Sequence, residues 1–334
     1  MPLIVGANVA VGKSWANLAT WLIGGLAAWG LVLSALLDLS GVMLKPNVDQ
    51  TTFAIDAASI VSGVAAGGFL IKPIRRDVAA VLPIDVDNPV HTLALVLATI
   101  LFGTQVAGVL FTDVLGYLAA QKPETIQDIV FEEVPFLILA LAGVGLFVRR
   151  APRDATGRLG FVRPAWWHPV LALAAAGLFL AALQGFDTAN HLLFPDVARR
   201  IDAVDQHLFS QLVNASWLGI VAIAVLPGVC EEALFRGALQ PRLGLVPAAL
   251  LFTSIHSQYA LSLDLAGIFV IAVCLGLIRK YTNTTTSMTA HVTYNLLASI
   301  SLTGTILYVA LGIEALLLVV LVVLGSATWR RRGH

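Results

Sequence analysis

Charged residues are scarce in this sequence. They make up 12% of its 334 residues, whereas a soluble globular chain carries about 25%. The formal net charge is zero, which excludes a nucleic-acid partner recruited by a basic surface. Cysteine is also rare: Cys230 and Cys274 both lie in apolar stretches, so there is no disulfide framework.

Hydrophobic residues are abundant instead, at 58%, with a mean hydropathy of +0.87. Long apolar stretches follow one another with short polar breaks, which predicts an all-α, polytopic bundle of about ten membrane helices. Short members of this series indicate helices buried in the bundle or a locally thin membrane. We expect helices near residues 16–37, 54–71, 90–118, 134–148, 168–186, 216–239, 246–258, 265–278, 286–302 and 305–328.

The breaks alternate in charge. Those after the even-numbered stretches carry most of the Lys and Arg, whereas the others are acidic, neutral or mixed. Because basic loops stay in the cytoplasm, this predicts a multi-pass plasma-membrane protein with both termini cytoplasmic. Apolar residues at helical spacing between 197 and 212 also predict an amphipathic helix on the outer membrane surface.

The most unusual stretch is Cys230-Glu231-Glu232-Ala233-Leu234-Phe235-Arg236, at the end of an apolar run. Charged groups at membrane depth are costly and usually functional. In a helix, Glu232 and Arg236 are i,i+4 neighbours in the order that favours an ion pair. Glu231 lies about 100° away around the axis and cannot share that pair, which leaves it free for chemistry.

Two further polar clusters lie in the same third of the chain: Phe252-Thr253-Ser254-Ile255-His256 and His291-Val292-Thr293-Tyr294-Asn295. Taken singly, His256 and Asn295 are best explained as groups that hydrogen-bond a neighbouring helix. Together, two acids, an arginine, two histidines and an amide buried in one bundle are better explained by a functional site than by structural roles alone. The acidic pair Glu132-Glu133 serves as a contrast, because it is expected in an exposed break.

This inventory suits hydrolysis of an acyl bond. A desolvated Glu231 can take a proton from water with help from His256, while His291 and Asn295 can donate hydrogen bonds to an oxyanion. We expect all four side chains to line one cavity. Carboxylate and imidazole groups can instead bind Zn²⁺, with Glu231, His256 and His291 as candidate ligands, and both alternatives stay open. A proton- or ion-coupled transporter and a non-catalytic membrane scaffold are the competing hypotheses.

Glu-Glu-x-x-x-Arg, Phe-x-x-x-His and His-x-x-x-Asn on successive helices resemble the CPBP family of intramembrane proteases, which includes the type II CAAX prenyl endopeptidases. The resemblance covers about residues 217–297, with 25 residues from Glu231 to His256 and 35 from His256 to His291. It implies that Glu231 activates water with His256, that His291 and Asn295 stabilise the oxyanion, and that Glu232 and Arg236 support the site.

The same resemblance implies a division of the chain and a class of partner. Residues 151–334 are expected to form the protease core, and residues 1–150 to form accessory membrane helices. The substrate is then a membrane-associated or CAAX-like peptide or protein, and membrane lipid is the second partner. The metal requirement of this fold is disputed, so the cofactor is either Zn²⁺ or none.

Overall fold

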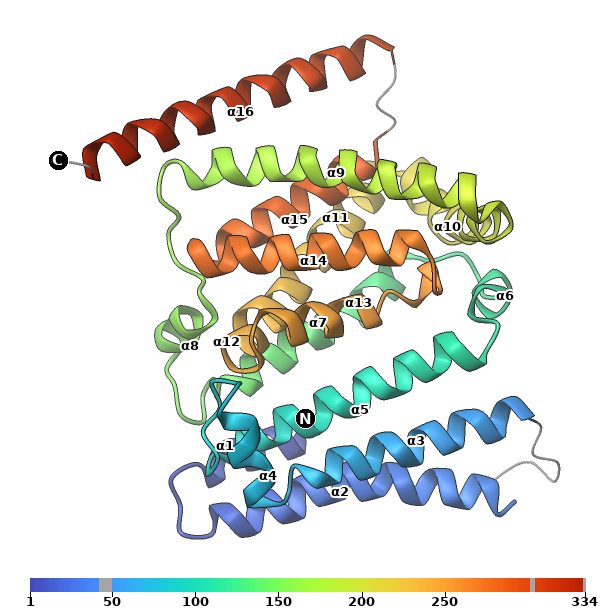
Figure 1. Ribbon diagram of the computed structural model, residues 1–334, viewed down its shortest axis with the longest axis vertical. Coiled ribbons are helices and arrows are strands. Elements are labelled where there is room, and N and C mark those ends of the chain that lie inside the picture. The colour runs from blue at the N-terminus through green and yellow to red at the C-terminus, as the bar shows by residue number, and fades with distance from the viewer. Residues whose placement is uncertain (42–49, 301–303, 333–334) are drawn as a thin grey trace.

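The computed structural model describes residues 1–41, 50–300 and 304–332, and this part of the chain is helical without a β-strand (Figure 1). Side chains of residues 214–215, 304–305 and 324–332 lie outside the description. The elements are α1 (Pro2–Ala10), α2 (Ala16–Leu39), α3 (Gln50–Gly68), α4 (Lys72–Ala79), α5 (Pro89–Phe111), α6 (Val114–Ala119), α7 (Ile126–Gly143), α8 (Pro152–Leu159), α9 (His168–Leu193), α10 (Pro195–Ala215), α11 (Trp217–Glu231), η1 (Glu232–Leu239), α12 (Gln240–Leu243), α13 (Leu245–Ser254), η2 (Ser257–Tyr259), α14 (Leu263–Tyr281), α15 (Thr284–Ala298) and α16 (Gly304–Arg332).

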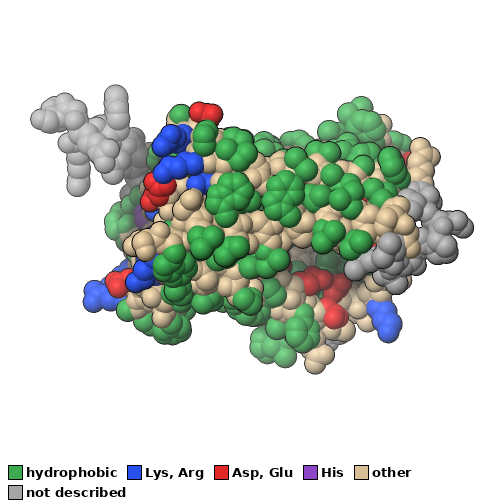
Figure 2. Space-filling model, turned by 90° about the horizontal axis from the view of Figure 1, so that it is seen from below, with side chains coloured by type: hydrophobic (Ala, Val, Ile, Leu, Met, Phe, Trp, Pro, Cys, Tyr) green, Lys and Arg blue, Asp and Glu red, His purple; other side chains and the backbone are tan. Residues whose placement is uncertain are grey.

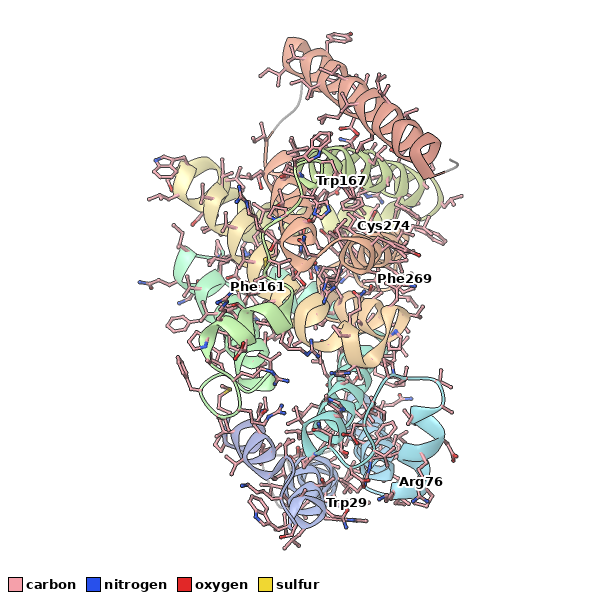
Figure 3. The ribbon with its side chains drawn as sticks, turned by 90° about the vertical axis from the view of Figure 1, so that its left-hand side faces the viewer. Trp29, Arg76, Phe161, Trp167, Phe269 and Cys274 are labelled. Carbon is pink, nitrogen blue, oxygen red and sulfur yellow. The ribbon has the colours of Figure 1, made fainter. Side chains whose placement is uncertain are left out.

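The long helices form a stack in which the N-terminal helices occupy one edge and α16 the other (Figure 1). Helices α2, α3 and α5 pack together, with Ala28, Leu70 and Val96 in a core of their own. Helix α7 packs instead on α11 and η1, which carry the candidate site. Figure 3 shows the molecule from the end that bears α8. Trp29 of α2 and Arg76 of α4 lie on one side, and Trp167 and Cys274 of α14 lie towards the other.

The outer faces of the helices are apolar. On α2, Leu18, Leu22 and Leu26 are 60%, 64% and 66% exposed, on a hydrophobic face whose Lys and Arg residues gather at one end (Figure 2). A continuous apolar surface of this kind is avoided in water and is expected against lipid. The chain is therefore an integral membrane protein built as a helical bundle.

Among the described residues, five helices are long and apolar enough to cross a membrane, or six if the pair α3 and α4, bent by 83°, is one span. The expected count of ten is therefore not confirmed. Helix α13 has only 10 residues, and the 18 residues of α7 include three acids. The tail of the expected helix 286–302 reaches residues 301 and 302, which lie outside the described part of the chain.

Two expected boundaries are wrong because of helix caps. Helix α7 begins at Ile126 rather than near residue 134, since Thr125 and Asp128 form a reciprocal capping box. The stretch expected as one helix over 90–118 is broken into α5 and α6. There the Asp113 carboxylate accepts a hydrogen bond from the Gly116 backbone at 3.1 Å and starts the second helix.

The expected amphipathic helix is present as α10, but protein covers its apolar face. Ile201, Val204 and Leu208 are buried and form one cluster with Leu115 of α6. Contact with neighbouring helices therefore explains the periodicity, which gives no separate support for contact with the membrane surface.

Helix α10 also carries a pH-dependent group. Burial, and then the charges of Asp202 and Asp264, raise the pKa of Asp205 to about 7, and its Oδ1 atom has no hydrogen-bond partner. A proton on Asp205 therefore stabilises the fold, because the folded-state pKa lies above that of the unfolded chain. The resulting penalty is full above pH 7, shrinks as the pH falls through 7 and is gone near pH 4.

We expect Asp205→Asn to raise the Tm by several degrees at pH 8 and to leave it almost unchanged near pH 4. Thermal melting in detergent across this range measures the difference. Asp196→Asn, on the exposed start of the same helix, is the control. An equal gain for Asp205→Asn at both pH values would show that its ionisation does not matter to folding.

Most basic segments lie at one end of the stack, although α10 at the other end carries Arg199 and Arg200. Helices α1, α4, α8 and α12 are together there, and α6 and α10 are at the other end (Figure 1). Arg75, at the start of α4, is fully buried and donates hydrogen bonds to the carbonyls of Phe69 and Leu70 at 2.8 and 2.7 Å. This arrangement agrees with the charge alternation along the sequence, and the cytoplasmic position of that end stays a prediction.

Candidate active site

The two acidic residues stand where the helix changes its winding. Glu231 is the last residue of α11, and Glu232 is the first residue of η1, a π-helical segment of eight residues. Segments of this kind, with i→i+5 hydrogen bonds, are frequent at functional sites. The structure thus places the Glu-Glu-x-x-x-Arg motif across this junction.

Glu232 is fully enclosed and fully partnered. Its Oε1 atom lies 3.5 Å from Arg236 Nε and 3.3 Å from His291 Nδ1. Its Oε2 atom accepts a hydrogen bond from the Ser287 hydroxyl, which also lies 3.0 Å from the Leu275 carbonyl. Glu232 therefore joins η1 to α15.

Arg236 is equally enclosed. It donates to the Ala272 carbonyl of α14 at 3.2 Å, and its guanidinium carbon lies 4.2 Å from the centre of the Phe252 ring. Side chains or carbonyls from η1, α13, α14 and α15 thus meet around the Glu232–Arg236 pair. Arginine is suited to this role, because its planar group binds a carboxylate and stacks on an aromatic face together.

Glu231 has a different environment. It is 4% exposed, yet its Oε2 atom has no hydrogen-bond partner. The nearest basic side chain is His291, whose Nε2 atom lies 3.9 Å from that oxygen. Since an unpaired buried carboxylate is costly, its retention favours a chemical role. One acid is held by neighbours, and the adjacent acid is left open.

His256 joins this group through an aromatic ring. Its imidazole lies 4.6 Å from the Phe252 ring, and Phe252 lies 5.8 Å from the His291 ring. The His256 Nδ1 atom is 2.8 Å from the Phe252 carbonyl, so Nδ1 carries the hydrogen and Nε2 is the free acceptor. A cavity of about 80 Å³ beside His256 is lined by α5 and α13 residues and does not include Glu231, His291 or Asn295.

Asn295 lies one turn beyond His291 on α15. In the described part of the chain its side chain makes no hydrogen bond, whereas its carbonyl accepts from the Ser299 backbone at 3.0 Å. The structure therefore brings Glu231, Glu232, Arg236 and His291 into direct contact. His256 and Asn295 lie at the edges of this group, and a single cavity shared by all the expected catalytic side chains stays a prediction.

Two residues of this neighbourhood were not expected. Ser287 lies one helical turn before His291, so the two side chains share a helix face. This i,i+4 spacing in the sequence could have predicted that Ser287 lies near the site. The interpretation of Glu132-Glu133 as an exposed break was wrong in part: both lie within α7, where Glu132 is exposed as expected, but Glu133 is half-buried and its Oε2 atom is enclosed without a hydrogen-bond partner. Glu133 shares a helix face with Ile129 and Ala140, which are buried. This helical spacing in the sequence could have predicted that Glu133 faces the protein interior.

The candidate metal ligands do not converge. Among the described residues, the group with three ligand atoms within 4.8 Å of one another is Asp187, His191 and Asp202, at the junction of α9 and α10. His191 lies 3.5 Å from Asp187 and 3.1 Å from Asp202, so ion pairing explains that group. Glu231 and His291 face each other at 3.9 Å without His256 as a third ligand at that distance, and whether a metal ion binds here stays a prediction.

The helices that hold Glu231 and His291 touch through Gly228. A Cβ atom on this glycine would lie 2.9 Å from the Val292 backbone nitrogen. We expect Gly228→Ala to push α11 and α15 apart, to cost about 1–3 kcal/mol of stability and to lower any activity that needs Glu231 beside His291. Thermal melting and a cleavage assay measure the two effects.

Gly185→Ala, on α9, is the matched control, since nothing lies within 4 Å of its added Cβ. It should be neutral or stabilise the helix by up to about 1 kcal/mol. Full activity and an unchanged Tm in Gly228→Ala would mean that the close approach of the two helices is not needed.

The comparisons with known proteins agree with these motifs. The family model of the Rce1-like type II CAAX prenyl endopeptidases matches residues 213–297, the part that holds the candidate site. An uncharacterized protein, YpbD, of Bacillus subtilis (strain 168) is 32% identical over 160 residues, which are 46% of this chain and 78% of YpbD. No solved structure matches the chain. The chain belongs to the Rce1-like family of type II CAAX prenyl endopeptidases.

Proposed function

We propose that this protein is an intramembrane endopeptidase in which Glu231 activates water. The observation that carries the proposal is the difference between two adjacent carboxylates. Glu232 has partners on both oxygens, whereas the buried Oε2 atom of Glu231 has none and faces His291 Nε2 at 3.9 Å. A water molecule that forms hydrogen bonds to Glu231 Oε2 and His291 Nε2 would lie beside a carboxylate that has few other partners and can accept its proton.

The reaction then follows from the positions of these groups. Glu231 takes a proton from water as the oxygen attacks the carbonyl carbon of the scissile peptide bond. Asn295 donates a hydrogen bond to the oxyanion that forms, and His291 does so through Nε2 when both of its ring nitrogens carry a proton, in the roles that the family resemblance implies. The carbon–nitrogen bond breaks when the proton held by Glu231 passes to the leaving nitrogen, which yields a carboxylate and an amine.

The neighbouring residues position this machinery. Glu232 accepts from His291 Nδ1 at 3.3 Å, which fixes the ring with Nε2 towards Glu231. His256 assists the base through its free Nε2 atom. The scheme assigns a role to each of these side chains and does not depend on a metal ion.

The substrate is proposed to be a membrane-associated or CAAX-like peptide. Glu231 lies nine residues before Gln240, so η1 alone separates it from α12. Since α12 follows at the basic end of the stack, the site lies in the cytoplasmic half of the membrane. The scissile segment must be unwound there, because a helix hides its carbonyls.

The test uses purified protein in vesicles with a library of lipid-anchored peptides presented on either face. Mass spectrometry identifies the products. We expect cleavage of peptides on the face where the basic segments lie. Cleavage only on the opposite face would refute the topology, and the absence of any cleavage would favour the scaffold hypothesis.

A further inference from the structure

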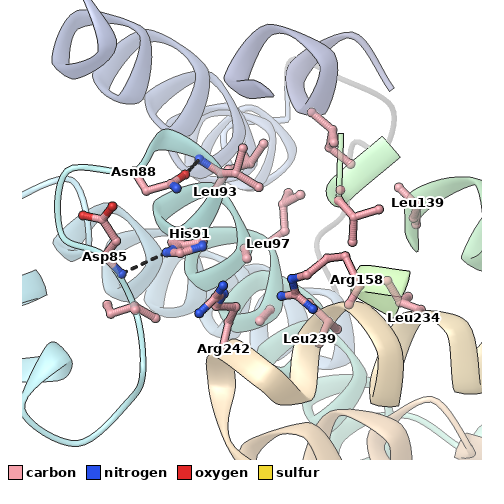
Figure 4. A pocket seen from close by; sticks show the side chains of 18 of the residues that line it. Asp85, Asn88, His91, Leu93, Leu97, Leu139, Arg158, Leu234, Leu239 and Arg242 are labelled. Atoms are coloured by element: carbon pink, nitrogen blue, oxygen red, sulfur yellow. Dashed lines mark hydrogen bonds between the residues drawn. The ribbon is translucent and has the colours of Figure 1, made fainter. Parts of the chain in front are cut away.

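A second cavity, of about 490 Å³, separates the N-terminal helices from the helices of the candidate site (Figure 4). Helix α5 forms one wall, and η1 and α13 form the facing wall. Its apolar lining includes seven leucines: Leu93, Leu97, Leu101, Leu139, Leu234, Leu239 and Leu251. The volume lies within the range of ligand pockets, about 300–1,000 Å³.

Cationic side chains gather at the mouth of this cavity. Arg149, Arg150, Arg158 and Arg242 all line it, and Arg158 and Arg242 extend towards each other between η1 and α5 (Figure 4). In the described part of the chain none of the four forms an ion pair with a carboxylate. Asp85 also lines the cavity, but it is exposed, and its Oδ1 atom accepts from the Asp87 backbone at 3.0 Å.

The arginines are held by neutral groups and retain unused donors. Arg158 donates to the Gly237 carbonyl at 3.2 Å, and Arg242 donates to the Pro83 carbonyl at 3.4 Å. The Arg242 Nε atom is buried without a hydrogen-bond partner. Burial, followed by the charges of Arg242 and Arg150, lowers the pKa of Arg158 to about 10.

Like charges collected around a partly buried cavity repel one another unless an anion lies between them. Arginine binds phosphate through several parallel N–H bonds, and basic pockets between membrane helices bind anionic headgroups. The leucine walls behind the arginines require an apolar partner, which a free phosphate does not supply. The lining residues Asp85, Arg158 and Arg242 come from segments at the end of the stack that holds α4, α8 and α12.

We propose that this cavity binds an anionic phospholipid of the cytoplasmic leaflet, with its phosphate on Arg158 and Arg242 and an acyl chain along the leucines of α5 and η1. The bound lipid fills the space between the N-terminal helices and η1, the segment that carries Glu232 and Arg236. This binding needs no peptidase activity, so it is tested separately from the proposed function.

The test is thermal melting of the purified full-length protein in detergent, with phosphatidylglycerol, phosphatidylcholine or inorganic phosphate added. We expect phosphatidylglycerol to raise the Tm in a concentration-dependent way, because a ligand of the folded state stabilises it. Phosphatidylcholine and inorganic phosphate should raise it much less. An equal shift with inorganic phosphate would overturn the assignment to a lipid, and an equal shift with phosphatidylcholine would overturn the role of charge.

Arg242→Gln should weaken phosphatidylglycerol binding about tenfold, since one charge-assisted contact is lost. This variant should fold, because Arg242 holds only one long hydrogen bond. Arg153→Gln is the matched control: it removes an equal charge from an exposed position on α8, outside the cavity, and should not change binding. Leu97→Trp fills the apolar part without altering charge and should abolish the lipid-dependent shift. Unchanged affinity in both Arg242→Gln and Leu97→Trp would refute the site.

Discussion

Glu231→Gln should lower the rate of peptide cleavage by about 10²–10⁴-fold, the usual contribution of a general base. The amide keeps the shape of the side chain but cannot take a proton from water. The Tm should stay the same or rise, because the substitution removes a buried carboxylate whose Oε2 atom has no hydrogen-bond partner. Initial rates on a membrane-anchored peptide and melting curves of the same sample measure both effects.

Glu132→Gln is the matched control for this result. Glu132 is an exposed acid on α7, one residue from Glu133, and it should retain full activity. Equal rates in the wild type and Glu231→Gln would refute the assigned base. A wild type without activity on any peptide would instead favour a scaffold that keeps these side chains for structure.

Arg236→Ala should have the largest effect on stability, about 3–5 kcal/mol. The substitution leaves the Glu232 carboxylate, which is fully buried, without its charged partner. It also removes the contact with the Phe252 ring at 4.2 Å and the bond to the Ala272 carbonyl. Chemical or thermal unfolding in detergent should therefore place this variant well below Glu231→Gln.

A double variant separates charge from packing. Glu232→Gln combined with Arg236→Met removes both charges and keeps most of the volume, so it should unfold less readily than Arg236→Ala. Arg153→Ala, from an exposed site, serves as the control for loss of a basic residue. Equal Tm values for Arg236→Ala and Glu231→Gln would contradict a structural role for the Glu232–Arg236 pair.

The sequence predicted the helical membrane class and much of the site because both depend on local patterns. The long apolar stretches predicted α2 and α9 closely, and i,i+4 spacing predicted the Glu232–Arg236 pair. The unequal surroundings of the two adjacent acids also followed from helix geometry, because only Glu232 pairs with Arg236.

What was missed depends on contacts between helices or on a local change in geometry. The place of Glu133 follows from the packing of α7 on α11, which no stretch of α7 sequence encodes by itself. The break at Asp113 is a capping effect inside a continuous apolar pattern. The π-helical winding of η1 is equally invisible in the hydrophobic period, since its residues are all compatible with an ordinary α-helix.

That winding has a consequence for how the chain tolerates change. Each hydrogen bond of a π-helical segment spans one residue more than a hydrogen bond of an α-helix. Removing one residue between Phe235 and Gln240 would therefore restore a regular α-helix. Such a deletion would improve local hydrogen bonding while it turned the following positions by about 100°. A regular backbone and the present placement of the residues after Phe235 therefore exclude each other here.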